Sequence, residues 1–440
     1  MIRQYLLILF SLSFVIVVVG YIPDTSWLYK LLSVLNAAIA TLFLFTDRER
    51  PYSLHKIVNL FILFFFVIAN AIQFSTKTNV TTFPMLVCAE DTIQYERFQL
   101  LTLLILILYN TAYPLFRKNK DFVHVTMESP SWKRLLLIAL FSLACTLFYY
   151  RNALPLMFFR GVLDFDGDLE VQDLGGGQVG FLLFDKIIRA LSFACCFWAI
   201  HCKLPRRIQW SLLLIMLLTL SPLSLARNAT AMYWLPIVLL MFKVLKRENI
   251  FVLVMLIGLL VVFPFLENFR HWNGELSSMS YSLDFMNEMH FDASQNFMIV
   301  LKQEVVTWGR QLLGVFLFWM PRSLWEAKPI GSGHFMAEQY SDFTNISMPF
   351  FAEGYLNFGF IGMILFTIIL AWFCAYFDDR FWNHHQELSL FAPYYMLLVS
   401  SLLFILRGDL MSSTSYTLAT LFDFYIVYKI ATFHRKTISE

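Results

Sequence analysis

Residues 351–377 read FAEGYLNFGFIGMILFTIILAWFCAYF and change from polar to apolar within a few positions. The first nine of them include a glutamate, an asparagine and two glycines, whereas the rest is an almost uninterrupted apolar run. About 20 apolar residues in a helix are enough to cross the hydrocarbon core of a bilayer. This stretch therefore predicts a membrane-spanning helix that begins directly after a polar segment.

The composition of the whole 440-residue chain agrees with a membrane protein. Hydrophobic residues make up 58% of it and charged residues only 15%, whereas soluble domains carry roughly 25% charged residues. Most residues must then face lipid or lie inside a helical bundle. The total net charge of +2 is uninformative by itself. The composition predicts membrane lipid as the surroundings of the chain, and we expect no nucleic-acid partner.

Apolar windows along the chain predict an all-α integral membrane protein, a single polytopic domain over 1–440, with about twelve transmembrane helices. The predicted spans are 4–20, 28–46, 57–74, 98–116, 135–150, 184–201, 209–225, 230–242, 250–266, 356–377, 390–406 and 414–431. Lys and Arg are concentrated in the alternate loops that share a side with the two termini. The positive-inside rule therefore predicts cytoplasmic N- and C-termini and puts the large late loop, 267–355, outside.

Within the large loop, apolar residues recur at three- and four-residue steps from Leu301 to Trp319. This spacing predicts an amphipathic helix over 297–320, ended by Pro321, that lies along the membrane interface. Arg310 falls on its polar face and is expected to face the outer water or a cavity. Alternatively, a long cationic side chain at that place simply snorkels to the interface.

An acidic loop begins at Asp164 and Asp166. A calcium-binding EF-hand is excluded because Leu169 stands where a glycine is needed and Gly175 where a glutamate is needed. Two interpretations stay open, a divalent metal–diphosphate site and a solvated acidic loop. No Cys/His spacing is typical of zinc, and we expect neither a metal site nor a cofactor.

Several cationic side chains map to the outer rim of the bundle, at the depth of a lipid headgroup. Two or more cations there, arginines above all, are what a departing lipid diphosphate requires, because a guanidinium binds phosphate oxygens through two hydrogen bonds. The predicted diphosphate ligands are Arg227, Arg310, Arg322, Lys328 and Arg407. A structural ion pair between Arg407 and Asp409 is an equally open interpretation.

Transfer of a sugar would also require a general base for the attacking hydroxyl. The residues that could act as the base are Glu353, His334, Asp292 and His290. The predicted sugar-binding residues are Trp325, Tyr355 and Asn357, although aromatic side chains at this depth also form ordinary interfacial belts. Glu353 and Asn357 are one helical turn apart on one face. The nearby glycines permit close backbone approach, for function or for plain helix packing.

Three segments resemble the Wzy-type O-antigen polymerases, also called oligosaccharide repeat unit polymerases. They are 321–333 (PRSLWEAKPIGSG), 345–359 (NISMPFFAEGYLNFG) and 406–410 (LRGDL). The order of predicted spans, with one large late periplasmic loop, is also similar. The three segments cover only a small part of the chain, and elsewhere the resemblance is one of topology.

The resemblance implies a multi-pass glycosyltransferase of the bacterial inner membrane that joins undecaprenyl-diphosphate-linked repeat units into the polysaccharide of lipopolysaccharide. It implies a metal-independent reaction in which periplasmic arginines bind the diphosphate, with Glu353 and His334 near the acceptor. A flippase of the Wzx type would deliver the substrate, and a chain-length regulator of the Wzz type is an expected partner.

Three rival functions remain open at this point. An O-antigen ligase differs only in its acceptor, and a metal-dependent glycosyltransferase would use Asp164 and Asp166. A polysaccharide flippase or transporter also fits twelve spans. Transporters, however, place polar groups near the bilayer midplane, whereas the polar residues here gather at the outer rim.

Overall fold

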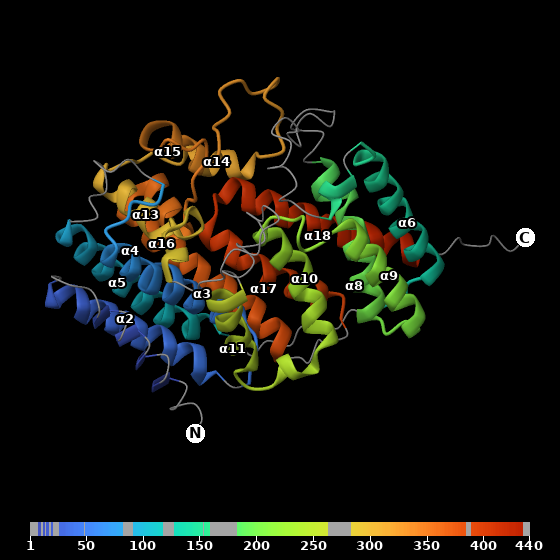
Figure 1. Ribbon diagram of the computed structural model, residues 1–440, viewed down its shortest axis with the longest axis horizontal. Coiled ribbons are helices and arrows are strands. Elements are labelled where there is room, and N and C mark those ends of the chain that lie inside the picture. The colour runs from blue at the N-terminus through green and yellow to red at the C-terminus, as the bar shows by residue number, and fades with distance from the viewer. Residues whose placement is uncertain are drawn as a thin grey trace, which may run out of the picture.

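The computed structural model describes residues 26–47, 49–81, 91–117, 127–152, 154–158, 183–262, 283–383 and 389–433, and a few positions between 8 and 20. Every regular element within these ranges is a helix (Figure 1). The first predicted span, 4–20, falls largely outside them. Five helical segments are long and apolar enough to cross a membrane: 27–46, 54–75, 92–116, 132–149 and 350–382. The fold is therefore that of a helical protein suited to a membrane.

The first half of the described chain contains α2 (Trp27–Thr46), α3 (Leu54–Phe61), η1 (Ile62–Ile68), α4 (Ala69–Ser75), α5 (Thr92–Phe116), α6 (Trp132–Tyr149), η2 (Leu154–Met157), η5 (Phe184–Ile188), α8 (Ala190–His201) and α9 (Arg206–Thr219). The second half contains α10 (Arg227–Met241), η6 (Lys243–Lys246), α11 (Ile250–Ile257), η7 (Gly258–Val262), η8 (Leu283–Asn287), η9 (Met289–Phe291), α13 (Ala293–Lys302), α14 (Arg310–Phe316), α15 (Ser332–Tyr340), α16 (Phe350–Trp382), α17 (Phe391–Arg407) and α18 (Leu410–Thr432). Each predicted span from 28–46 onward overlaps helix, but several of these helices are short.

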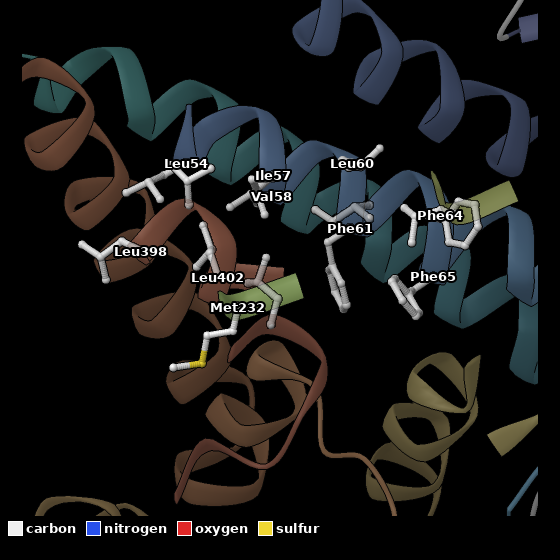
Figure 2. Packing of buried hydrophobic residues seen from close by; sticks show 14 of the residues in the cluster. Leu54, Ile57, Val58, Leu60, Phe61, Phe64, Phe65, Met232, Leu398 and Leu402 are labelled. Carbon is white, nitrogen blue, oxygen red and sulfur yellow. The ribbon is translucent and has the colours of Figure 1, made fainter. Parts of the chain in front are cut away.

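The continuous helix formed by α3, η1 and α4 lies at the centre of the bundle. Its membrane window is buried throughout. The buried Asn59, Asn70 and Gln73 form hydrogen bonds with neighbouring segments, so these polar side chains have protein rather than lipid around them. Figure 2 shows Leu54, Val58 and Phe61 of this helix near Leu402 of α17 and Met232 of α10. The core is thus built around residues 54–75.

The predicted amphipathic helix over 297–320 is wrong as a single helix. The structure has two short helices, α13 and α14, with a linker in which Glu304, Trp308 and Gly309 have positive φ angles of 50°, 51° and 83°. Most of α13 is buried rather than laid on a surface. The linker N–H groups of Thr307 and Gly309 bond instead to carbonyls of α16. These tertiary hydrogen bonds override the local helical pattern.

Helix α16 is broken at Phe358 and Gly359, where φ is −145° and +63°. The short arm, 350–357, folds back along 360–382. The two arms are so close that a Cβ placed on Gly362 would lie 2.1 Å from the carbonyl oxygen of Gly354. The predicted close backbone approach at these glycines is confirmed. The change from polar to apolar sequence therefore marks an elbow, with the polar residues packed beside the apolar helix.

Candidate functional site

A polar cluster lies where α13, α15, the short arm of α16 and the α17–α18 turn meet. We define it by the residues Asp292, Ser332, Glu353, Arg407 and Asp409. Figure 1 shows α13, α14 and α15 together at one edge of the molecule. This edge carries most of the residues predicted from the sequence to bind substrate.

Asp292 is the most heavily hydrogen-bonded member of the cluster. Its carboxylate accepts from Asn296 Nδ2 (2.8 Å), from Ser347 N (3.1 Å) and Oγ, and from Arg407 Nη2 (3.1 Å). Only 1% of its surface is exposed. A buried carboxylate with this many donors is held in one position, so it is placed to orient Arg407.

Arg407 ends α17 and is held along one edge only. Its Nη2 donates to Asp292 and to the carbonyl of Met289 (2.8 Å). Within the described chain its buried Nε has no hydrogen-bond partner, although 24% of the side chain is exposed. A guanidinium fixed in this way keeps donors for a further acceptor.

The alternative in which Arg407 pairs with Asp409 is wrong. Asp409 is the N-cap of α18 and accepts from Met411 N (2.7 Å) and Ser412 N (3.3 Å). Gly408 separates the end of one helix from the start of the next, so the two side chains serve different helices. Burial raises the pKa of the Asp409 carboxyl.

Glu353 is fully buried in the short arm of α16. Its Oε2 accepts from Ser332 Oγ (2.8 Å) and its Oε1 from Leu410 N (3.0 Å). Gly331 lies against Asp409, where a Cβ would be 1.9 Å from Oδ2. The starts of α15 and α18 thus converge on two carboxyl groups, which is where helix dipoles stabilise negative charge.

Asn357 connects the elbow to α14. Its Oδ1 accepts from Leu312 N (2.8 Å) in the first turn of α14, and its Nδ2 donates to the carbonyl of Glu353 (2.9 Å). The predicted shared face of Glu353 and Asn357 is confirmed. Arg310, the first residue of α14, is exposed, and the Asn357 cap fixes the helix that carries it.

The segment between α14 and α15 carries Arg322, Trp325 and Lys328. Lys328 Nζ donates to the carbonyls of Phe318 (2.6 Å) and Met320 (2.8 Å), and Arg322 Nη1 donates to the carbonyl of Lys328 (2.9 Å). Partial burial, followed by the charge of Arg322, lowers the pKa of Lys328. Lys328 therefore holds the segment together, whereas Arg322 remains exposed. Trp325 is half-buried.

The remaining predicted residues are dispersed. His334 is largely exposed, with Nε2 3.3 Å from Glu338 Oε1 and Nδ1 bonded to the Thr344 carbonyl. Tyr355 lines a separate cavity of about 500 Å³ beside α5. Arg227 begins α10, which packs against α17, and His290 lies in the turn before α13.

Metal binding was considered for the same side chains. The part of the chain that the structure describes contains no group of three or more His, Cys, Asp or Glu residues able to hold a metal ion. Asp164 and Asp166 lie outside the described residues.

A second buried polar network was missed by the sequence analysis. At the far end of α16, Asp378 accepts from Leu54 N (2.9 Å), His55 N (3.2 Å), Tyr113 Oη (2.9 Å) and Tyr395 Oη (2.6 Å). The adjacent Asp379 pairs with buried Arg50 at 2.6 Å. The signal in the sequence was the pair of acidic residues at 378–379, directly after an apolar run. Two buried carboxyl groups need hydrogen-bond or ion-pair partners.

No family model, no curated protein and no solved structure matches the chain.

Proposed function

We propose that this protein is a glycosyltransferase of the bacterial inner membrane that polymerises undecaprenyl-diphosphate-linked oligosaccharides on the periplasmic side. The resemblance of three short segments to Wzy-type polymerases suggests this activity. Two of those segments, 345–359 and 406–410, contribute Ser347, Glu353, Arg407 and Asp409 to one place in the fold. Residues that are far apart in sequence but share a site are typical of a binding centre.

The half-held guanidinium of Arg407 carries the proposal. Its Nη2 donates to Asp292 and to the carbonyl of Met289, while 24% of the side chain stays exposed. A diphosphate oxygen is a suitable acceptor for the exposed part of this guanidinium. Arg310 and Arg322, both exposed, would supply further positive charge along the same edge of the molecule.

In the proposed reaction, a sugar hydroxyl of the incoming unit attacks the anomeric carbon of the growing glycan. The bond from that carbon to the diphosphate oxygen breaks, and the diphosphate leaves with the electron pair. A general base takes the hydroxyl proton. Of the residues predicted for this role, His334 and His290 are partly exposed, whereas Asp292 and Glu353 are buried and use their oxygens for hydrogen bonds inside the fold.

The test is a lipopolysaccharide gel from a strain lacking this gene, complemented with the natural chain, with Arg407→Ala or with Arg206→Ala. Arg206 is exposed at the start of α9, on the predicted opposite side, and serves as the control. We expect Arg407→Ala to lose the long chains but keep core carrying one repeat unit, with normal protein in the membrane.

Loss of one electrostatic donor to a leaving group typically costs about 3 kcal/mol, or roughly 100-fold in rate. Normal chain length in Arg407→Ala would contradict the role of this residue. If the gene deletion also removes the band with one repeat unit, the protein acts as a ligase, a flippase or an assembly enzyme instead.

A further inference from the structure

A second cavity lies at the other end of the bundle, beside the Asp378 network. Its volume is about 510 Å³, within the range of roughly 300–1,000 Å³ that is usual for ligand sites. Its polar lining comes from the segment after α2 and from α3 and α5: Asp47, Glu49, His55, Asn110, Tyr113 and Arg117. The charge distribution predicts that this end is cytoplasmic. The polymerase proposal makes no use of it.

His55 is a buried polar group of this cavity, with only 4% of its surface exposed. Asn59 and Asn110 exchange two side-chain hydrogen bonds, which fix both amides. The second hydrogen of Asn59 Nδ2 donates to the carbonyl of His55 at 3.0 Å, and the same nitrogen lies 3.5 Å from His55 Nε2. The other ring nitrogen, Nδ1, has no hydrogen-bond partner among the described residues.

The lining of the cavity carries charges of both signs. Asp47 interacts electrostatically with Lys56, but its Oδ2 accepts no hydrogen bond within the described ranges. The neighbouring Glu49 is exposed. Arg117 approaches Asp379 at 3.5 Å through Nε and is 41% exposed. The cavity thus presents two carboxylate acceptors and a guanidinium donor.

We infer that this cavity binds the zwitterionic headgroup of an amine-bearing phospholipid. The phosphate would be bound by Arg117, and the ammonium by Asp47 and Glu49. A simple anion would be repelled by the two acids, and a simple cation would leave Arg117 unmatched. A ligand that carries both charges matches the acids and the guanidinium together.

The walls of the cavity favour a lipid over a soluble zwitterion. Phe43 and Pro114 line it, and the next residues along α2 and α5 are strongly exposed apolar side chains. Leu115 is 80% exposed and Leu42 is 44% exposed. Acyl chains could lie along these surfaces while the headgroup enters the polar cavity.

The inference is tested with the full-length protein in mild detergent, titrated with dioctanoyl phosphatidylethanolamine or dioctanoyl phosphatidylglycerol, with bound lipid counted by native mass spectrometry. The two lipids share a phosphate, but only the first has an amine. We expect at least about tenfold preference for phosphatidylethanolamine, which corresponds to about 1.4 kcal/mol.

Matched variants separate the roles of the acids and the guanidinium. Asp47→Asn combined with Glu49→Gln should abolish the preference for phosphatidylethanolamine. Arg117→Gln should weaken the binding of both lipids. Glu248→Gln and Arg206→Gln remove exposed charges that do not line the cavity and should leave binding unchanged. The substituted residues are at least partly exposed, so folding should persist, and an unchanged unfolding temperature would verify it.

Three results would overturn the inference. Equal binding of the two lipids by the natural protein would remove the role of the amine. Unaltered preference in the Asp47/Glu49 variant would place the site elsewhere. Displacement of the lipid by free phosphoethanolamine at the same concentration would identify a soluble ligand, since the acyl chains would then contribute nothing.

Discussion

Arg407 and Asp292 are 115 positions apart in the sequence, yet their side chains meet at 3.1 Å in the polar cluster. The arginine ends α17, and the aspartate precedes α13. Because the carboxylate also accepts from Ser347 and Asn296, it is fixed before the arginine binds to it. The pair therefore joins three segments of the fold and sets the direction of the guanidinium.

This relationship predicts the effect of Asp292→Asn. The amide nearly preserves shape but removes the charge that holds Nη2, so Arg407 should lose its orientation. We expect polymerisation to slow by at least about tenfold while the protein stays in the membrane. Chain-length distributions on gels and the amount of membrane protein are the measurements. Glu248→Gln, which removes an exposed carboxylate just before α11 (Ile250–Ile257), is the control for the loss of any carboxylate.

The contact between Gly331 and Asp409 predicts that Gly331→Ala is destabilising. A methyl group would lie 1.9 Å from Asp409 Oδ2, so the N-cap of α18 or the start of α15 must move. Such overpacking typically costs 1–3 kcal/mol, so we expect about 2 kcal/mol here. Thermal unfolding in detergent measures it. Gly258→Ala is the control, because no atom lies within 4 Å of its added Cβ; equal unfolding temperatures would contradict the packing.

Asn357 is predicted to stabilise the first turn of α14. Asn357→Ala removes the acceptor of Leu312 N, and losing a capping side chain costs about 1 kcal/mol. Hydrogen exchange at the Leu312 amide should accelerate roughly fivefold. Asn357→Asp keeps the acceptor oxygen and should retain most of the protection at Leu312. Equal exchange rates in the natural and alanine proteins would show that another group caps the helix.

The ion pair between Arg50 and Asp379 predicts a large loss of stability when one partner is removed. Both side chains are almost fully buried, and breaking such a pair leaves an uncompensated charge at a cost of about 3–5 kcal/mol. Asp379→Asn should therefore lower the unfolding temperature markedly. Arg50→Met combined with Asp379→Leu should recover much of the loss. A single variant as stable as the natural protein would show that the pair contributes little.

Helix positions could be predicted from the sequence because apolar runs leave few alternatives. Residues 351–377 illustrate this, since their apolar part located the long arm of α16, although α16 itself begins at Phe350, before the polar stretch. The elbow at Gly359 and the linker at Trp308 and Gly309 could not be predicted in the same way. Their conformation depends on hydrogen bonds to carbonyls some fifty residues away, and local periodicity carries no information about such partners.

Several residues of the polar cluster could be predicted from the sequence, but their hydrogen-bond partners could not. The sequence identified Asp292, Glu353 and Arg407, but it gave no reason to pair Asp292 with Arg407. It suggested Asp409 as a partner because two neighbouring charges of opposite sign are the simplest match. Gly408 ends one helix before the next begins, and that reversal assigns the two charges to different segments. Diphosphate binding by these residues stays a prediction.

The break in α16 also has a consequence for how the chain tolerates the bilayer. A non-helical turn in hydrocarbon normally exposes carbonyl groups that water cannot reach. Here Thr307 N and Gly309 N bond to the carbonyls of Leu356 and Asn357, at 2.7 and 3.0 Å. The α13–α14 linker thus supplies N–H donors to carbonyls that have no donor within the broken helix. The chain can therefore break α16 at the elbow while the carbonyls of Leu356 and Asn357 keep hydrogen-bond donors from protein.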